Sequence, residues 1–197
     1  KKSEDNQEGE DNFHGVGGPL KVEKMRASFK VLDLFMEAAE EFGYPKTSDF
    51  NTGNNEGMGY FPLNVKNGYR CSTAVGYLNP IKKRKNLKIL TNAHIKNIEF
   101  ENKKAISVNF WKNNQLLNVK TNKEIILSAG TIGSPHILQA SGVGPGDLLK
   151  KNNINIVKDH PSVGKNLMDH LMLRPVYKVK NLDTLNNIYH SNYRKIT

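Results

Sequence analysis

Glu124-Ile125-Ile126-Leu127-Ser128-Ala129-Gly130 is the stretch that decides the fold class. Its continuous apolar run ends in small residues, which is typical of a strand buried on both faces of a parallel sheet. A helix is predicted directly afterwards, because Ser134-Pro135 suits an N-cap and first turn, Ile137 and Leu138 follow at helical spacing, and Gly142 suits a helix end. In open parallel sheets, ligands bind where such a strand ends and the next helix begins.

The rest of the chain predicts both short strands and helices. Four alternating segments precede the apolar run and indicate a meander: Leu87–Leu90, Ile95–Phe100, Ala105–Trp111 and Leu116–Thr121. Further strands are predicted at Leu20–Val22, Ile154–Val157 and Leu173–Val179. Helical segments are predicted at Ala27–Phe42, ended by Gly43, at Ser72–Leu78, ended by Asn79-Pro80, and at Asp147–Lys151. The fold class is therefore α/β, in the mixed α+β sense.

Two polar stretches predict irregular structure. Residues Lys1–Asn12 are acidic and lack hydrophobic periodicity, so we expect a mobile segment with organised structure starting near Phe13. The Asn- and Gly-rich stretch Asp49–Gly59 is expected to be a connecting loop, and Asn67-Gly68 a turn.

Composition narrows the classes of partner. The net charge of +10 is compatible with an anionic partner, but the lysines are scattered or lie in runs such as Lys82-Lys83-Arg84-Lys85 without interleaved aromatic residues. Nucleic-acid binding is therefore disfavoured. No apolar run is long enough to span a membrane, and the polar first residues do not resemble a secretory signal. The single cysteine, Cys71, precludes an internal disulfide and weakly favours a cytoplasmic location.

Motifs for several kinds of chemistry are missing. The six histidines show no metal-ligand spacing, so no metal site is predicted, and His160 and His170 are interpreted as structural, with a functional role for His170 left open. No Gly-x-Ser-x-Gly elbow or Walker loop is present. The glycine cluster Ser141–Gly146 follows a predicted helix, whereas a dinucleotide fingerprint follows a strand, so the cluster is interpreted as a helix end.

The run Gly130–Gly144 closely resembles the second signature of the glucose-methanol-choline (GMC) oxidoreductases. The run contains small residues followed by Ser134-Pro135, then the aliphatic residues Ile137 and Leu138, and finally Ser141-Gly142-Val143-Gly144. These positions have the family's spacing. Four further stretches occur in the family's order: Asn55–Gly59, Gly68–Ala74, Asn86–Ile95 and Val163–His170. The resemblance covers about Gly18 to Val179.

The resemblance implies a cofactor and a reaction. The family carries FAD on a Rossmann-like domain, roofs the substrate pocket with an antiparallel sheet of a second domain, and oxidises alcohols by hydride transfer to the flavin. By motif, Ile95 falls where the backbone meets the adenine, and Ser128, Ala129 and Gly130 fall at the strand end beside the cofactor. Small residues at that point let a backbone approach a ligand closely.

The resemblance also implies a division of the chain. Residues 13–67 and 170–197 would belong mainly to the substrate domain, the latter as the start of its sheet, and residues 68–169 to the FAD-binding domain. The family's Gly-x-Gly-x-x-Gly pyrophosphate loop and its His-Pro-x-Gly segment with the proton-accepting histidine are absent, so no catalytic residue is assigned. The sequence is thus interpreted as part of a longer enzyme.

Two functions remain open at this point. The region Arg70–Ala74 looks like the choline and aliphatic-alcohol dehydrogenase branch, so the expected substrate is choline or a primary aliphatic alcohol, with the electron acceptor and any membrane association undetermined. The alternative is a non-catalytic scaffold or interaction module that keeps the fold alone.

Overall fold

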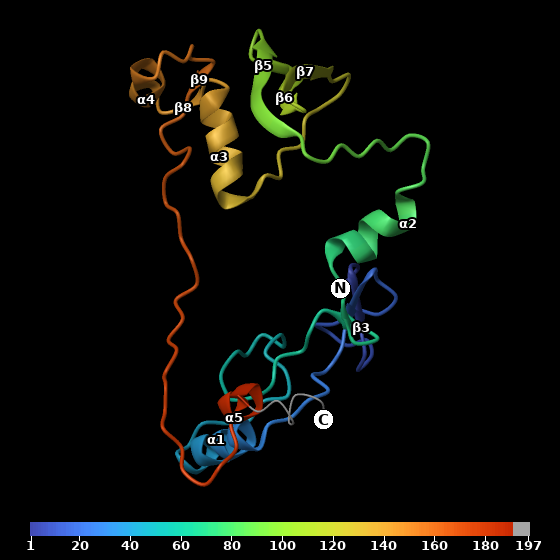
Figure 1. Ribbon diagram of the computed structural model, residues 1–197, viewed down its shortest axis with the longest axis vertical. Coiled ribbons are helices and arrows are strands. Elements are labelled where there is room, and N and C mark those ends of the chain that lie inside the picture. The colour runs from blue at the N-terminus through green and yellow to red at the C-terminus, as the bar shows by residue number, and fades with distance from the viewer. Residues whose placement is uncertain (191–197) are drawn as a thin grey trace. The chain divides into compact units, whose positions relative to one another are not determined.

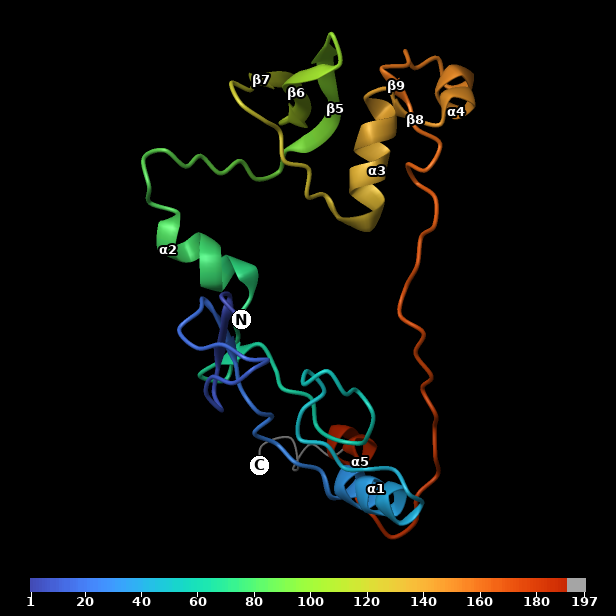
Figure 2. The ribbon, with the colours of Figure 1, turned by 180° about the vertical axis from the view of Figure 1, so that it is seen from behind.

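The computed structural model describes residues 1–190, and the chain divides into two compact units (Figures 1 and 2). The first unit comprises Lys1–Lys88 and the residues from Pro175 onward, and the second unit comprises Ile89–Arg174. Within residues 1–190, no helix combines the length and apolar character needed to cross a bilayer. The cytoplasmic location and the assignment of segments to cofactor and substrate domains stay predictions.

A three-stranded antiparallel meander opens the second unit. It consists of β5 (His94–Glu101), β6 (Lys104–Lys112) and β7 (Gln115–Lys120), with β6 in the middle. Three of the four predicted strands are therefore confirmed. The fourth, Leu87–Leu90, is wrong, because this segment pairs with no strand and the side chains of Ile89 and Leu90 stay largely exposed.

Helix α3 (Gly130–Ala140) lies beside the meander, with β8 (Val143–Gly144), α4 (Gly146–Lys151) and β9 (Lys158–Asp159) on its other side, as both views show (Figures 1 and 2). β8 and β9 pair in parallel. The predicted helical turn at Asp147–Lys151 is confirmed, whereas the strand expected at Ile154–Val157 lies a few residues later, at β9. The shift arises because Val143 and Gly144 pair with Lys158 and Asp159.

Gly142 ends α3 as the sequence predicts. Its φ is +87°, a conformation that glycine adopts at little cost, and its carbonyl accepts hydrogen bonds from the N–H groups of Val157 and Lys158. The start of the helix differs from the prediction. The helix begins at Gly130, so Pro135 lies inside it and Ser134 is not the N-cap.

The parallel strand predicted at Glu124–Ala129 is wrong for the described structure. The segment is extended without strand pairing, and the side chain of Ile126 is 79% exposed. A parallel strand is held by neighbours on its edges and by helices on its faces. None of the strands in residues 1–190 pairs with this segment, and Ile125 and Leu127 are only half-buried.

The N-terminal stretch contains a strand where irregular structure was expected. β1 (Glu4–Asn6) pairs in parallel with β2 (Leu20–Val22), so the prediction that organised structure starts near Phe13 is wrong and the strand predicted at Leu20–Val22 is confirmed. Two ion pairs support the contact: Asp5 with Lys21 at 3.2 Å and Glu8 with Lys24 at 2.6 Å. Here backbone pairing and charge, rather than apolar burial, order the segment.

Helix α1 (Lys30–Glu41) confirms the predicted amphipathic helix. Tyr60 stabilises its N-terminus, because the hydroxyl accepts a hydrogen bond from the Phe29 N–H and donates one to Asp33 at 2.7 Å. Gly43, with φ +98°, follows its end. The predicted loop at Asp49–Gly59 has no regular structure apart from a single bridge between Lys46 and Met58.

The remaining elements of the first unit are short. β3 (Val65–Lys66) and β4 (Tyr69–Arg70) form a hairpin, and the turn predicted at Asn67-Gly68 joins its two strands. A π-helical turn, η1 (Ala74–Leu78), continues into α2 (Asn79–Ile81), so the predicted stop at Asn79-Pro80 is wrong.

Two expectations concern the C-terminal part. The strand predicted at Leu173–Val179 is wrong, because the segment is extended and unpaired and leaves most of its apolar side chains exposed. Helix α5 (Leu185–His190) follows and lies beside α1 (Figures 1 and 2). Of the predicted start of a sheet over residues 170–197, residues 191–197 lie outside the described residues.

Candidate cofactor-binding site

Ser128, Ala129 and Gly130 lie at the entrance to α3, and all three are exposed. Ala129 is the N-cap residue, and its N–H donates a hydrogen bond to the Ser134 hydroxyl at 3.0 Å. This bond bends the chain back onto the first turn of the helix. Gly130 has φ +81°, and a Cβ added to it would meet no atom within 4 Å. The backbone is therefore open on this side.

The start of α3 has the properties of a surface that a cofactor can approach. No side chain caps the helix, so the N–H groups of its first turn have no capping side chain as an acceptor. A helix of this length carries a partial positive charge at its N-terminus, which favours phosphate and other electron-rich groups. The residues present therefore fit a dinucleotide that runs past this point, although they supply no pyrophosphate-binding glycine loop.

Ile95, the other predicted site residue, lies near the start of β5 and pairs with Phe110 of β6. Its side chain is half-buried. A bulge between Ile95 and Asn97 interrupts the strand register, and bulges redirect backbone groups at sheet edges and near binding sites. The backbone at Ile95 is thus distinct from that of a regular strand.

Ser141 joins the two elements that carry the predicted site residues. Its buried hydroxyl accepts a hydrogen bond from the Ile98 N–H of β5 at 2.8 Å and donates one to the Ile137 carbonyl of α3 at 2.6 Å. In the sequence, Ser141 stood out only as the first residue of the glycine cluster at the predicted helix end. A hydrogen bond between residues 43 positions apart has no local signal from which it could be predicted.

The structure places Ile95 and the 128–130 segment in one unit but does not bring them together. Ser141 binds β5 at the C-terminal end of α3, whereas Gly130 is at the opposite end, about 16 Å away along a helix of 11 residues. Contacts at separate points suit an extended dinucleotide better than a compact ligand. The two predicted contacts are therefore compatible with one cofactor.

A polar network stiffens the meander on which Ile95 lies. The carboxylate of Glu99, in β5, accepts hydrogen bonds from Ser107 and Asn109 of β6 and from Asn118 of β7. The network therefore includes all three strands. These bonds, that from Ser107 first, hold the pKa of Glu99 below its usual value. The side chain is therefore ionised at neutral pH and ties the strands to one another.

A groove of about 600 Å³ runs along α3 and contains residues of two of the motifs found in the sequence. One wall includes Thr131 and His136 of α3, and the other is the segment 164–168 with Lys165. Gln139 fixes the second wall, because its side-chain amide donates a hydrogen bond to the Val163 carbonyl at 3.0 Å. The sequence did not predict that these motifs meet, since only the folded chain brings them together.

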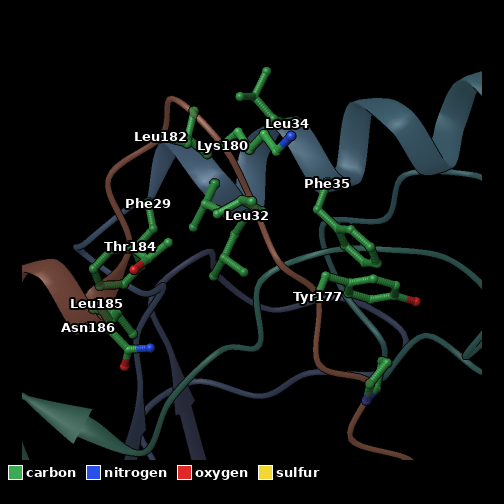
Figure 3. A pocket seen from close by; sticks show the side chains of 13 residues that line it. Phe29, Leu32, Leu34, Phe35, Tyr177, Lys180, Leu182, Thr184, Leu185 and Asn186 are labelled. Atoms are coloured by element: carbon green, nitrogen blue, oxygen red, sulfur yellow. The ribbon is translucent and has the colours of Figure 1, made fainter.

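A second, larger cavity of about 750 Å³ lies within the first unit, between α1 and the segment 175–186 (Figure 3). Its lining is mainly apolar, and Phe35 and Tyr177 face each other with ring centroids 6.0 Å apart. Lys180 is the charged residue in this lining, and no carboxylate accompanies it.

Histidines and carboxylates show no metal-binding arrangement in residues 1–190, since no group of three His, Cys, Asp or Glu side chains is placed to hold an ion. His160 and His170, singled out in the sequence, are exposed. His14 is instead the buried histidine, and its surroundings are described below.

Comparisons with known proteins bear on the whole chain. A family model described as GMC oxidoreductase matches residues 2–172. An oxygen-dependent choline dehydrogenase of Pectobacterium atrosepticum is 41% identical over 182 residues, covering 91% of this chain and 33% of that protein. One from Proteus mirabilis is 44% identical over 184 residues, with the same coverage. The chain thus spans about a third of the length of the curated relatives it matches.

Solved structures show the same architecture. Pyridoxine 4-oxidase from Mesorbium loti is 29% identical with a TM-score of 0.73, covering 82% of this chain and 32% of that one. An FAD-dependent oxidoreductase from Chaetomium thermophilum is 28% identical with a TM-score of 0.74, covering 82% and 30%. Formate oxidase has a TM-score of 0.76 at 24% identity, covering 86% and 31%, and at that identity it informs on the fold alone.

Proposed function

Because the chain belongs to the GMC oxidoreductase family, we propose that it forms part of the FAD-binding scaffold of an enzyme that oxidises the CH–OH group of an alcohol. The family, the mixed α/β fold and FAD as the family's cofactor were predicted from the sequence, and the comparisons confirm all three. The open backbone at the start of α3 is the observation that carries the proposal to particular residues.

In this proposal, Ser128, Ala129 and Gly130 let the cofactor pass close to the chain, and the first-turn N–H groups of α3 orient its polar atoms. Ile95 contacts the adenine end through its backbone. Ser141 keeps β5 and α3 in a fixed register, so both contacts hold the same cofactor. The flavin, when bound, supplies the hydride acceptor.

In this proposal, the residues of this chain position the cofactor and do not take part in the reaction themselves. The groove between α3 and the segment 164–168 borders the start of α3, so its walls would lie beside the cofactor path. No described residue is assigned as the base that takes the alcohol proton. The family resemblance implies that a histidine of a His-Pro-x-Gly segment takes that proton, and this sequence contains no such segment.

Choline is the substrate we favour. Relatives at 41% and 44% identity carry the name oxygen-dependent choline dehydrogenase, and the Arg70–Ala74 region resembles that branch. A primary aliphatic alcohol is the second candidate, because the two substrates share the reacting CH₂–OH group and differ in the quaternary ammonium.

The full-length protein should discriminate between choline and its uncharged isostere, 3,3-dimethylbutan-1-ol. Mixed anaerobically with each alcohol, the flavin should lose its absorbance near about 450 nm at least about tenfold more efficiently with choline, a difference of ~1.4 kcal/mol. Equal or better reduction by the isostere would assign a primary aliphatic alcohol. A flavoprotein that neither alcohol reduces would support the non-catalytic scaffold instead.

A further inference from the structure

His14 is a buried imidazole with a carboxylate on each side. Only 6% of the residue is exposed. Nδ1 lies 3.0 Å from Asp11 Oδ2, and Nε2 lies 3.0 Å from Asp49 Oδ2. A neutral imidazole has one N–H and one lone pair, so it can donate to only one of these carboxylates. Carboxylates beside both ring nitrogens favour the doubly protonated imidazolium, which donates a hydrogen bond from Nδ1 to Asp11 and forms an ion pair with Asp49.

The two partners come from different parts of the first unit. Asp11 follows β1 in the N-terminal segment, and Asp49 belongs to the loop of residues 45–59. We propose that His14 is a proton-dependent clamp, which holds the loop of residues 45–59 against the N-terminal segment and releases it when the imidazolium loses a proton. The clamp does not depend on which alcohol the enzyme oxidises.

The Asp49 side of the clamp is the side that opens. Asp11 is held in place by the backbone N–H groups of Phe13 and His14, which donate to its Oδ1 at 2.7 and 2.6 Å. A neutral His14 therefore keeps its remaining proton on Nδ1, toward Asp11. The Nε2 lone pair then faces the Asp49 carboxylate, and the contact turns from attractive to repulsive.

Asp49 also organises the loop that it anchors. Its Oδ1 accepts hydrogen bonds from the backbone and side-chain N–H groups of Asn51, and its own backbone is bonded to Thr47. The next residue, Phe50, packs against Phe61 with ring centroids 4.8 Å apart. His14, Phe50 and Phe61 all line a cavity of about 460 Å³ in this unit. Release of Asp49 therefore loosens one wall of that cavity.

The charges around the ring set the direction of the response. Asp11, Asp49 and Glu4 of β1 face His14, and together they outnumber its single positive charge. The hydrogen bond that His14 donates to Asp11 is the main reason that the pKa of His14 lies above its usual value, against the opposing effect of burial. Because the pKa is raised on folding, the stabilisation is complete below about pH 6.5 and is lost as the pH rises through the higher folded-state pKa.

Hydrogen exchange of the full-length protein, read by mass spectrometry at peptides from residues 45–59, tests the clamp. Between about pH 6 and pH 9, exchange corrected for the intrinsic rate should rise by about tenfold or more in the wild type. His14→Gln should exchange at the released level throughout. Asp49→Asn should show a flat profile, because its amide can donate to a neutral Nε2 or accept from a protonated one.

His160→Gln is the matched control, since this exposed histidine in the second unit should leave the profile as in the wild type. A wild-type profile without the pH-dependent rise would overturn the proposal. So would a full rise in Asp49→Asn, or a His14→Gln profile that titrates as the wild type does.

Discussion

Full-length protein carrying Ala129→Leu should retain at least about tenfold less FAD than the wild type, a loss of ~1.4 kcal/mol or more in binding free energy. Ala129 is exposed and precedes the first residue of α3, so a leucine fits its backbone conformation and meets little of the protein. If the cofactor runs past this point, the added side chain occupies its path. The ratio of flavin absorbance to protein absorbance after desalting measures the effect.

Stability separates this explanation from a folding defect. A leucine at an exposed site away from any ligand changes the free energy of unfolding by less than about 0.5 kcal/mol. Ala38→Leu, at an exposed alanine in α1 of the first unit, is the matched control and should bind FAD normally. An Ala129→Leu protein with full flavin content and normal stability would remove Ser128–Gly130 from the cofactor site.

The second large effect concerns the end of α3. Gly142→Ala should lower the free energy of unfolding of the second unit by more than about 2 kcal/mol. The φ of +87° is unfavourable for alanine, and the added Cβ would lie well inside van der Waals contact with the Asn155 carbonyl oxygen. The shift of the urea unfolding midpoint of the apoprotein, taken with its slope, measures the loss.

Gly130→Ala separates the two causes. Gly130 has a similar φ of +81°, but a Cβ added there meets no atom within 4 Å, so only the backbone penalty of about 1–2 kcal/mol applies. Gly142→Ala should therefore be the more destabilising of the two. Equal losses of unfolding free energy in the two variants would show that Asn155 moves away from the added Cβ at no cost. That result would contradict the steric contribution assigned to Gly142.

Elements whose signal is local were predictable from the sequence. The strands of the meander and the body of α3 follow from period-two and period-3.6 patterns, and asparagine-rich turns with positive φ at Asn102 and Asn113 close the hairpins. The predicted strand at Leu87–Leu90 failed because alternation over four residues carries no information about a partner.

Elements that depend on distant residues were not predictable in the same way. The strand β1 forms because Leu20–Val22 pairs with it, and Glu124–Ala129 lacks strand pairing in residues 1–190 although its composition is that of a buried strand. The same holds for the candidate site. Motifs located Ile95 and Ser128–Gly130, but the Ser141 hydrogen bonds that connect their elements and the Asp49 partner of His14 emerge only from the folded chain.

The position of FAD in the full-length protein is the most direct test of the central claim, and a structure of the holoenzyme measures it. We predict that the adenine contacts the backbone at Ile95 and that the cofactor passes the exposed backbone of Ser128, Ala129 and Gly130 at van der Waals distance. A cofactor bound away from both segments would contradict the assignment of this chain to the FAD-binding scaffold.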